Sequence, residues 1–219
     1  MEVEILGKLK KAVIEYDKEG AASWARKAVE AKVDPVKAFN AITEVMKEVG
    51  DDFEKGELWL PDLVGAADAM QGATLILDEE IKRTGAKKET AGAVVAGSVF
   101  GDIHSIGISM VCTLLTAAGF DVHMLGVNIT ADQFIEAIRK YKADILAMSA
   151  LLTLTASEQK KVIDALKKEG IRDKVKVMVG GGAISTDFAK SIGADGYAPT
   201  APGAVELARK LQGKGGQGC

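Results

Sequence analysis

GAVVAGSVFGDIHSIG, residues 92–107, joins a short run of small and β-branched residues to a polar loop that ends in glycine. The same change from an apolar run to a loop recurs along the rest of the chain. Short apolar runs separated by helical periodicity predict buried parallel strands that alternate with helices. The predicted strands span 92–99, 121–125, 144–149, 175–179 and 195–198, and the predicted helices span 107–119, 131–141, 157–169, 185–192 and 201–212. This pattern predicts an α/β fold with a five-stranded parallel sheet in the flavodoxin-like, Rossmann-like order 2-1-3-4-5.

The first half of the chain has a different character, because every periodic segment before residue 85 is helical. The predicted helices span about 2–16, 20–31, 35–53 and 61–84, and four helices with short connections indicate a small helical bundle. Asp34-Pro35 is a strong start signal, since Asp34 caps the helix and Pro35 suits the first helical position. The polar segment 83–90 is the predicted linker. The predicted organisation is a helical-bundle cap domain over 1–85, a sheet domain over 91–212 and a flexible tail over 213–219.

The composition excludes several classes of function. The chain has 219 residues and a formal net charge of −3, and no predicted helix carries a basic cluster, so we expect no nucleic-acid partner. No apolar run approaches the ~18 residues that span a bilayer, and residues 1–11 lack the basic-then-apolar order of a signal peptide. Cys112 and Cys219 provide neither a disulfide framework nor a pair of metal ligands. We therefore expect a cytoplasmic protein without a membrane partner.

The loops that follow the strands are where function is expected, because ligands of such sheets bind beyond the carboxyl ends of the strands. These loops read FGDIHSI, GVNITA, ALLTLTA, GGGAIS and PTAPG. Two of them are rich in glycine, and one carries small residues and hydroxyls. None contains the phosphate-binding patterns G-x-x-x-x-G-K-[ST] or G-x-G-x-x-G, so the sequence does not favour nucleotide chemistry.

Asp102 and His104 are the candidate chemical pair of the first loop. Two residues apart on an extended segment, their side chains can lie on one side, and Gly107 is expected to let the chain turn tightly into the next helix. A histidine held by a carboxylate has one ring nitrogen fixed as a donor, which leaves the other to ligate a metal. By itself this pattern is weak, because a lone histidine in a loop is more often a hydrogen-bonding residue than a ligand.

Two further motifs follow at fixed distances. Forty-one residues separate Gly107 from Ser149-Ala150-Leu151, and 28 residues separate Leu151 from Gly180-Gly181-Gly182. The motifs D-x-H-x-x-G, S-x-L and G-G resemble those of proteins that bind cobalamin with its lower nucleotide displaced and a protein histidine on cobalt. Over about residues 1–212, the chain resembles the corrinoid proteins of methylotrophic and O-demethylating methyltransferase systems, and the cobalamin-binding region of methionine synthase.

The resemblance implies a role for each motif residue. His104 corresponds to the lower axial ligand of cobalt, Asp102 to its hydrogen-bonding partner, and Thr155 to a hydroxyl that completes this relay. The nucleotide tail is expected beside the S-x-L motif and Thr153, against the glycines of the fourth strand, where the extra glycine leaves the register open by one. The implied cofactor-binding residues of this half are Asp102, His104, Ser105, Ile106, Gly107, Ser149, Leu151, Thr153, Thr155, Gly180, Gly181 and Gly182. These residues could instead have ordinary structural roles, because a hydroxyl at the end of a strand often caps the next helix and a glycine run often marks a turn.

The helical half resembles the same family. Residues 53–61, FEKGELWLP, resemble the loop and helix start that lie over the upper, methyl-bearing face of cobalamin. In this resemblance Phe53 and Leu60 shield the upper ligand, and a cobalt–carbon bond needs water excluded. The alternative for both residues is ordinary core of the helical bundle.

Two positions depart from the family pattern. Ser105 stands where family members commonly have Asp, and Ile108 stands where they commonly have Lys. Neither is a ligand position, so these departures bear on the charge beneath the corrin rim and on the fit to partner proteins. His123, on the second predicted strand, matches no motif residue and is expected to be structural.

The resemblance implies a methyl carrier with no catalytic residues of its own. It would accept a methyl group on Co(I), giving methylcobalamin, from a substrate-specific corrinoid methyltransferase, and pass it to a second methyltransferase that uses tetrahydrofolate or coenzyme M. A reductive activator is the third implied partner. The alternatives are a cobalamin-dependent sensor or regulator, the small subunit of an adenosylcobalamin mutase, and a flavodoxin-like domain that binds no corrin. Sensors carry an additional DNA-reading domain and mutase subunits lack the helical half, so the sequence favours the carrier.

Overall fold

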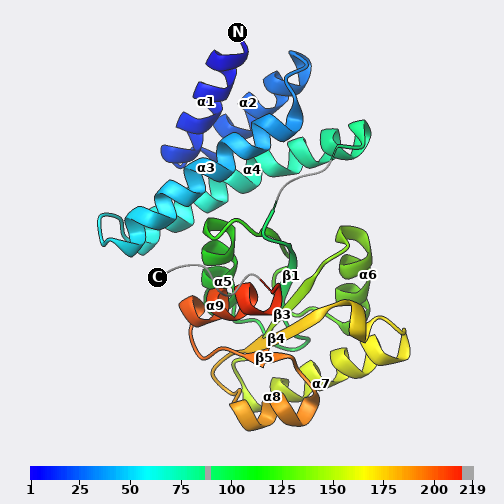
Figure 1. Cartoon of the computed structure of the whole chain (residues 1–219). Coiled ribbons are helices and arrows are strands. Elements are labelled where there is room, and N and C mark those ends of the chain that lie inside the picture. The colour runs from blue at the N-terminus through cyan, green and yellow to red at the C-terminus, as the bar shows by residue number, and fades with distance from the viewer. Residues whose placement is uncertain (87–89, 214–219) are drawn as a thin grey trace. The chain divides into compact units, whose positions relative to one another are not determined.

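The computed structural model describes residues 1–86 and 90–213, apart from the side chain of Glu54. The chain divides into two compact units, Met1–Thr90 with Thr116–Gly119 and Ala91–Leu115 with Phe120–Cys219, and both are drawn in Figure 1. Residues 87–89 of the predicted linker lie outside the described residues, as do residues 214–219 of the predicted tail.

The first unit is the predicted helical bundle. Its helices are α1 (Glu2–Ile14), α2 (Lys18–Glu30), α3 (Pro35–Glu54) and α4 (Leu60–Thr84). Asp17, Asp34 and Asp62 each accept a backbone N–H hydrogen bond at a helix start, at 2.8, 2.9 and 2.8 Å. These carboxylates satisfy N–H groups that have no partner within the first turn. Of the three, Asp34 is the one that the sequence analysis used as a start signal.

The interior of the bundle is built mainly from aliphatic side chains and methionines, with Phe39 of α3 among them. Leu9, Ile42, Met46, Leu63 and Leu77 are among its fully buried residues. Helix α2 contributes only alanines to this interior, and Gly72 of α4 lies so near it that a Cβ would meet the backbone oxygen of Lys18 at 2.8 Å. Small residues thus let two helices approach closely. No helix within residues 1–86 and 90–213 combines the length and the apolar character needed to cross a membrane.

The second unit is an α/β domain around a five-stranded parallel sheet. Its strands are β1 (Ala93–Ser98), β2 (Asp121–Met124), β3 (Ile145–Ser149), β4 (Lys176–Gly180) and β5 (Gly196–Tyr197). Their order across the sheet is β2-β1-β3-β4-β5, which confirms the predicted order. The helices are α5 (Ile106–Ala117), α6 (Ala131–Tyr141), α7 (Thr153–Lys168), α8 (Thr186–Ile192) and α9 (Ala201–Leu211), with a short 3-10 helix at Arg172–Lys174. In the register, Ser149 pairs with Ser98 of β1 and with Gly180 of β4, so the carboxyl ends of three strands are level.

The two faces of this sheet are used differently. On one face, strand residues such as Val95 and Leu146 pack with Phe134 of α6 and with side chains of α7 and α8. The ribbons of these three helices are labelled in Figure 1. Because alternate strand positions point to opposite faces, Ala147 and Met178 face the other side. There they line a cavity with residues of α5 and α9. The hydrophobic core therefore supports the sheet from one side, and the cavity lies on the other.

One helix begins earlier than the sequence predicted. The prediction was 157–169, whereas α7 begins at Thr153. The backbone N–H groups of Thr155 and Ala156 donate to the carbonyl of Leu152 at 3.1 and 3.0 Å, which starts the helix inside the loop after β3. Threonine is a weak helix former, so this segment looked irregular in the sequence. As a result, Thr155 lies in the first turn of a helix and is buried.

Gly107 is not the turn residue that the sequence predicted. Gly107, predicted to turn the chain, lies in the first turn of α5 without a positive φ, and a Cβ there would meet no atom within 4 Å. The left-handed glycine of this loop is Gly101, with φ of +79°. Gly181 after β4 has φ of +112°, and its Cβ would lie 2.1 Å from the backbone oxygen of Ala150. Gly181 is therefore a position that other residues fill only with strain.

The substitution Gly181→Ala is expected to destabilise the fold, because it combines a left-handed backbone with a clash against Ala150. The backbone strain alone costs about 1–3 kcal/mol. Gly107→Ala is the matched control, since a helical position with open space gains up to about 1 kcal/mol from alanine. Urea unfolding of the chain without added cofactor, followed by circular dichroism, measures both variants. Equal midpoints for the two would contradict this account of the β3–β4 contact.

Candidate functional site

The candidate site lies at the carboxyl edge of the sheet, where the loops after β1, β3 and β4 meet. A cavity of about 720 Å³ lies there, within the usual size range of small-molecule sites. Its walls come from the start of α5, the ends of β3 and β4, and the segment that leads into α9. No Asp, Glu, Lys or Arg is among the described residues that line it. The cavity therefore suits a ligand that is held by shape and by a few polar groups.

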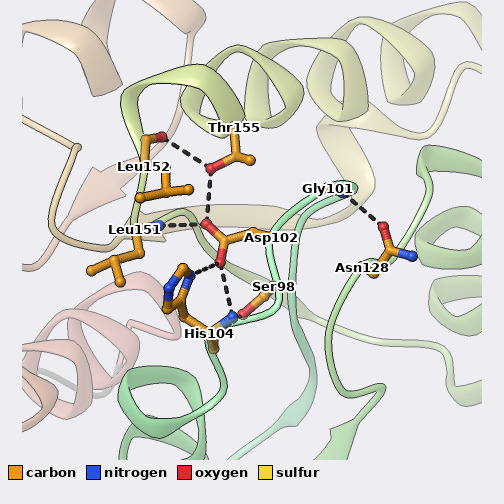
Figure 2. Close-up of polar contacts among 8 residues, drawn as sticks. All are labelled: Ser98, Gly101, Asp102, His104, Asn128, Leu151, Leu152 and Thr155. Carbon is orange, nitrogen blue, oxygen red and sulfur yellow. Dashed lines mark hydrogen bonds and ion pairs between the residues drawn. The ribbon is translucent and has the colours of Figure 1, made fainter.

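Asp102 is the centre of the polar network beside this cavity (Figure 2). Asp102 is 1% exposed, and each of its carboxylate oxygens has two hydrogen-bond partners. Oδ1 accepts from the backbone N–H of His104 at 3.0 Å and lies 2.8 Å from the ring Nδ1 of the same residue. Oδ2 accepts from the backbone N–H of Leu151 at 2.6 Å and from the hydroxyl of Thr155 at 2.8 Å. The network thus joins the loop after β1 to the start of α7.

These hydrogen bonds keep Asp102 ionised. Burial by itself raises the pKa of a carboxyl group, because the charged form loses its water. Here the donated hydrogen bonds outweigh burial and lower the pKa of Asp102 to about 2. An ionised carboxylate only accepts hydrogen bonds, so Nδ1 of His104 has to carry the proton that joins them. The neutral imidazole then has its lone pair on Nε2.

His104 is held through its backbone as well as through its ring. Its side chain is 44% exposed, and Nε2 has no hydrogen-bond partner among the described residues. Ser98, fully buried at the end of β1, donates its hydroxyl to the backbone carbonyl of His104 at 2.8 Å. Two separate buried groups therefore fix this residue, and its ring lines the cavity.

The sequence prediction missed several contributors to this network. Ser98 reads as an ordinary strand residue, and Leu151 was predicted only as a residue lining the slot. Asn128, at a left-handed φ of 58°, donates its N–H to the carbonyl of Asp102 at 2.9 Å, and its side chain accepts from the N–H of Gly101 at 2.7 Å. A backbone N–H donor cannot be recognised from a sequence, because every residue except proline has one. The available signals were a hydroxyl inside an apolar strand and an asparagine in the loop after β2.

Glycines form one wall of the cavity. Gly180, Gly181 and Gly182, at the end of β4 and just after it, form this glycine wall, whereas Gly107 lines the cavity from α5. Gly181 lies against the backbone of Ala150, and a Cβ on Gly182 would come within 2.9 Å of a methyl carbon of Leu151. These two glycines therefore let the segments that follow β3 and β4 pack closely against each other. Ser149 also lines the cavity, so the S-x-L and glycine motifs lie side by side.

The remaining predicted site residues lie in different places. Ser105 and Ile106 are exposed and line the cavity, whereas Thr153 is exposed at the start of α7 and is not among the lining residues. Phe53 and Leu60 belong to the helical unit, at the end of α3 and the start of α4, and both are half-buried. That they cover a ligand stays a prediction.

Ile108 and His123 also have defined surroundings. Ile108 is buried and lines the cavity from α5. The ring of His123 stacks on Tyr141 with 3.7 Å between centroids and 11° between planes, and its Nε2 lies 3.4 Å from Asp121 Oδ2. His123 is not among the residues that line the cavity, and the structural role expected for it stays a prediction.

Comparison with known families agrees with this site. Two family models match the chain, both described as a B12 binding domain, one over residues 92–206 and one over residues 5–77. The first covers all the strands and every residue of the Asp102 network. The fold and the matched models together define a cobalamin-binding protein.

Similar proteins place the chain more narrowly. It is 41% identical to a corrinoid protein of Desulfitobacterium hafniense, over 98% of this chain and 100% of the relative. It is 40% identical to trimethylamine corrinoid protein 1 of Methanosarcina acetivorans, over 95% of this chain and 97% of the relative. Among solved structures, the methanol:cobalamin methyltransferase complex of Methanosarcina barkeri matches with a TM-score of 0.75 and 31% identity, over 96% of this chain and 80% of that one. The chain belongs to the corrinoid proteins, which confirms the resemblance seen in its motifs.

The described residues fit a corrinoid cofactor. Histidine is the commonest metal ligand among side chains, and a carboxylate on its second nitrogen is the usual means of orienting it. His104 has this arrangement, with Nε2 available. Gly180, Gly181 and Gly182 line the same cavity, so no side chain projects into it from these three positions. These features suit a metal-centred ring with a long appended group.

In the protein without cofactor, neutral His104 is expected to be the Nδ1-protonated tautomer. The ionised carboxylate of Asp102 can only accept a hydrogen bond, so Nδ1 has to donate it. Long-range ¹H–¹⁵N correlation spectra distinguish the two tautomers. In Asp102→Asn the amide can also donate, so a mixture of tautomers is expected. An Nε2-protonated imidazole in the wild-type protein would contradict the orientation seen here.

Proposed function

We propose that this corrinoid protein is a methyl carrier. The methyl group would come from a substrate-specific corrinoid methyltransferase and would go to a second methyltransferase that uses tetrahydrofolate or coenzyme M. The observation that carries the proposal is the buried, ionised Asp102, which holds His104 with Nε2 available beside a cavity of about 720 Å³. Relatives named for trimethylamine and a solved structure named as a methanol:cobalamin methyltransferase complex support the same reading.

The chain's own residues hold the cofactor. When bound, cobalamin supplies a cobalt centre that takes up a methyl group in the Co(I) state and gives it to an acceptor. His104 would ligate cobalt through Nε2. Asp102 and Thr155 would keep this nitrogen oriented and basic. The nucleotide tail would lie along the glycine wall, next to Ser149 and Leu151.

The helical unit would cover the reactive upper face. Phe53 and Leu60 are apolar and half-buried, so each has surface available for a ligand beyond its packing in the bundle. Two enzymes that use one cobalt in turn need access to it. We therefore assign residues 1–85 and 91–212 to separate domains that move about the segment 83–90. A reductive activator is the third proposed partner, because a Co(I) centre is lost by oxidation.

Electron paramagnetic resonance of the Co(II) holo-protein tests the ligand assignment. With ¹⁵N-labelled protein and unlabelled cobalamin, hyperfine coupling from one ¹⁵N is expected, and His104→Ala should remove it. The side chain of His104 is 44% exposed, so its removal should leave the fold intact. His123→Ala is the matched control and should keep the coupling. Coupling that comes only from the unlabelled nucleotide would refute a protein ligand.

The isolated holo-protein is expected to show no turnover with any methyl donor. Asp102 and His104 are both committed to the cofactor, and burial raises the pKa of the Cys112 thiol to about 12, which leaves it protonated. Demethylation of methylamines or methanol should appear only when a matching methyltransferase, a methyl-accepting enzyme and a reductive activator are present. Sustained turnover by the repurified chain alone would instead identify a self-sufficient methyltransferase.

A further inference from the structure

Gln159 is a buried polar side chain outside both the Asp102 network and the cavity lining. It lies on α7, one turn after Thr155, and is 0% exposed. Its side-chain NH₂ donates to the backbone carbonyls of Met148 and Gly180, each at 3.2 Å. Met148 lies at the end of β3 and Gly180 is the last residue of β4. Gln159 therefore ties together the carboxyl ends of two neighbouring strands, from the face of the sheet opposite to the cavity.

The amide oxygen of Gln159 makes burial of this side chain costly. Oε1 of Gln159 is buried and has no hydrogen-bond donor among the described residues. A buried amide oxygen without a donor opposes folding. Methionine has a similar length and no such oxygen, so it could fill the same space. The contribution that only the glutamine makes is the bridge between the two strand ends.

Both bridged strands border the cavity. Leu151 follows β3 and Gly182 follows β4, and both line it. The ladder between β4 and β5 includes Val179 and stops before Gly180. On its β3 side this strand end is held by the pairing of Gly180 with Ser149, by the bond from the Ala150 N–H to the Gly180 carbonyl at 3.1 Å, and by the Gln159 bridge.

We propose that Gln159 is a positioning residue that sets the spacing of the β3 and β4 ends, and so the fit of the slot around the nucleotide tail of cobalamin. The inference rests on the proposed function, because it takes the glycine-walled cavity as the place of that tail. Thr155 and Gln159, four residues apart, share one face of α7. Thr155 acts through Asp102 on the histidine ligand, whereas Gln159 acts on the slot. The two effects are therefore separable by substitution.

The test compares two corrinoids that differ in the tail. The full-length chain is loaded with cobalamin or with cobinamide, which lacks the lower nucleotide, and release is followed after a chase. Gln159→Met should speed cobalamin release about tenfold, which corresponds to ~1.4 kcal/mol, and leave cobinamide release unchanged. Protein-derived ¹⁵N coupling from His104 should persist in this variant. Val162→Ala, on the same helix and 2% exposed, is the matched control for loss of packing, and it should not discriminate between the two corrinoids.

Either of two results would overturn the proposal: unchanged cobalamin release in Gln159→Met, or equal acceleration of cobalamin and cobinamide release. Should Gln159→Met fail to fold, the wild-type holo-protein gives a second measurement. The Gln159 side-chain NH₂ should exchange slowly with solvent, and exchange at the rate of a free amide would equally overturn it. Absence of His104 coupling in the wild-type protein refutes the proposed function instead, so the two failures are distinguishable.

Discussion

The burial of one carboxylate, that of Asp102, is the constraint on which the rest of the site depends. An isolated ion taken out of water into an apolar medium costs tens of kcal/mol, so the chain has to surround this group with donors. Hydrogen bonds to a charged group contribute about 1.5–3 kcal/mol each, and Asp102 has four, two of them from Leu151 and Thr155. The loop after β1 therefore takes its shape only when β3 and α7 are in place. The orientation of His104 is a consequence of tertiary structure, although its partner is two residues away in the sequence.

The parallel sheet makes this convergence possible. Level carboxyl ends of β1, β3 and β4 bring three loops to one edge, and the early start of α7 turns one of those loops into a helix. A helix fixes its side chains more firmly than a loop does, because each residue's backbone is committed to the hydrogen-bonding pattern of its neighbours. Thr155 and Gln159 gain definite positions in this way. Their polar groups then reach Asp102 and the strand ends without competing with water.

The sequence predicted the order of the elements better than the detail of the site. Apolar runs between glycine-rich or polar loops marked all five strands, and helical periodicity together with the Asp34-Pro35 start signal marked the bundle. The motif spacing singled out Asp102, His104 and Thr155, which the structure brings together; their part in binding cobalt stays a prediction. The rest was hidden for physical reasons. Gly107 looked like a turn residue, because a sequence does not show backbone dihedral angles. The N–H of Leu151 is common to every residue type, and Gln159 reads as one more polar residue of an amphipathic helix until packing shows that it is buried.

The location of the residues proposed to hold the cofactor affects how a carrier could serve two enzymes. All the described residues of the Asp102 network, the glycine wall and the Gln159 bridge belong to the second unit. The groups proposed to hold the cofactor therefore all lie outside the helical unit. Helix α7 carries two of these groups and is fixed to the sheet by Val162, Ile163 and Leu166, all buried. Since the proposed ligand His104 and the proposed nucleotide slot share this support, they would keep their geometry while the proposed cover is displaced. A methyl carrier needs this separation, because its partners have to reach the cobalt without loosening the cofactor.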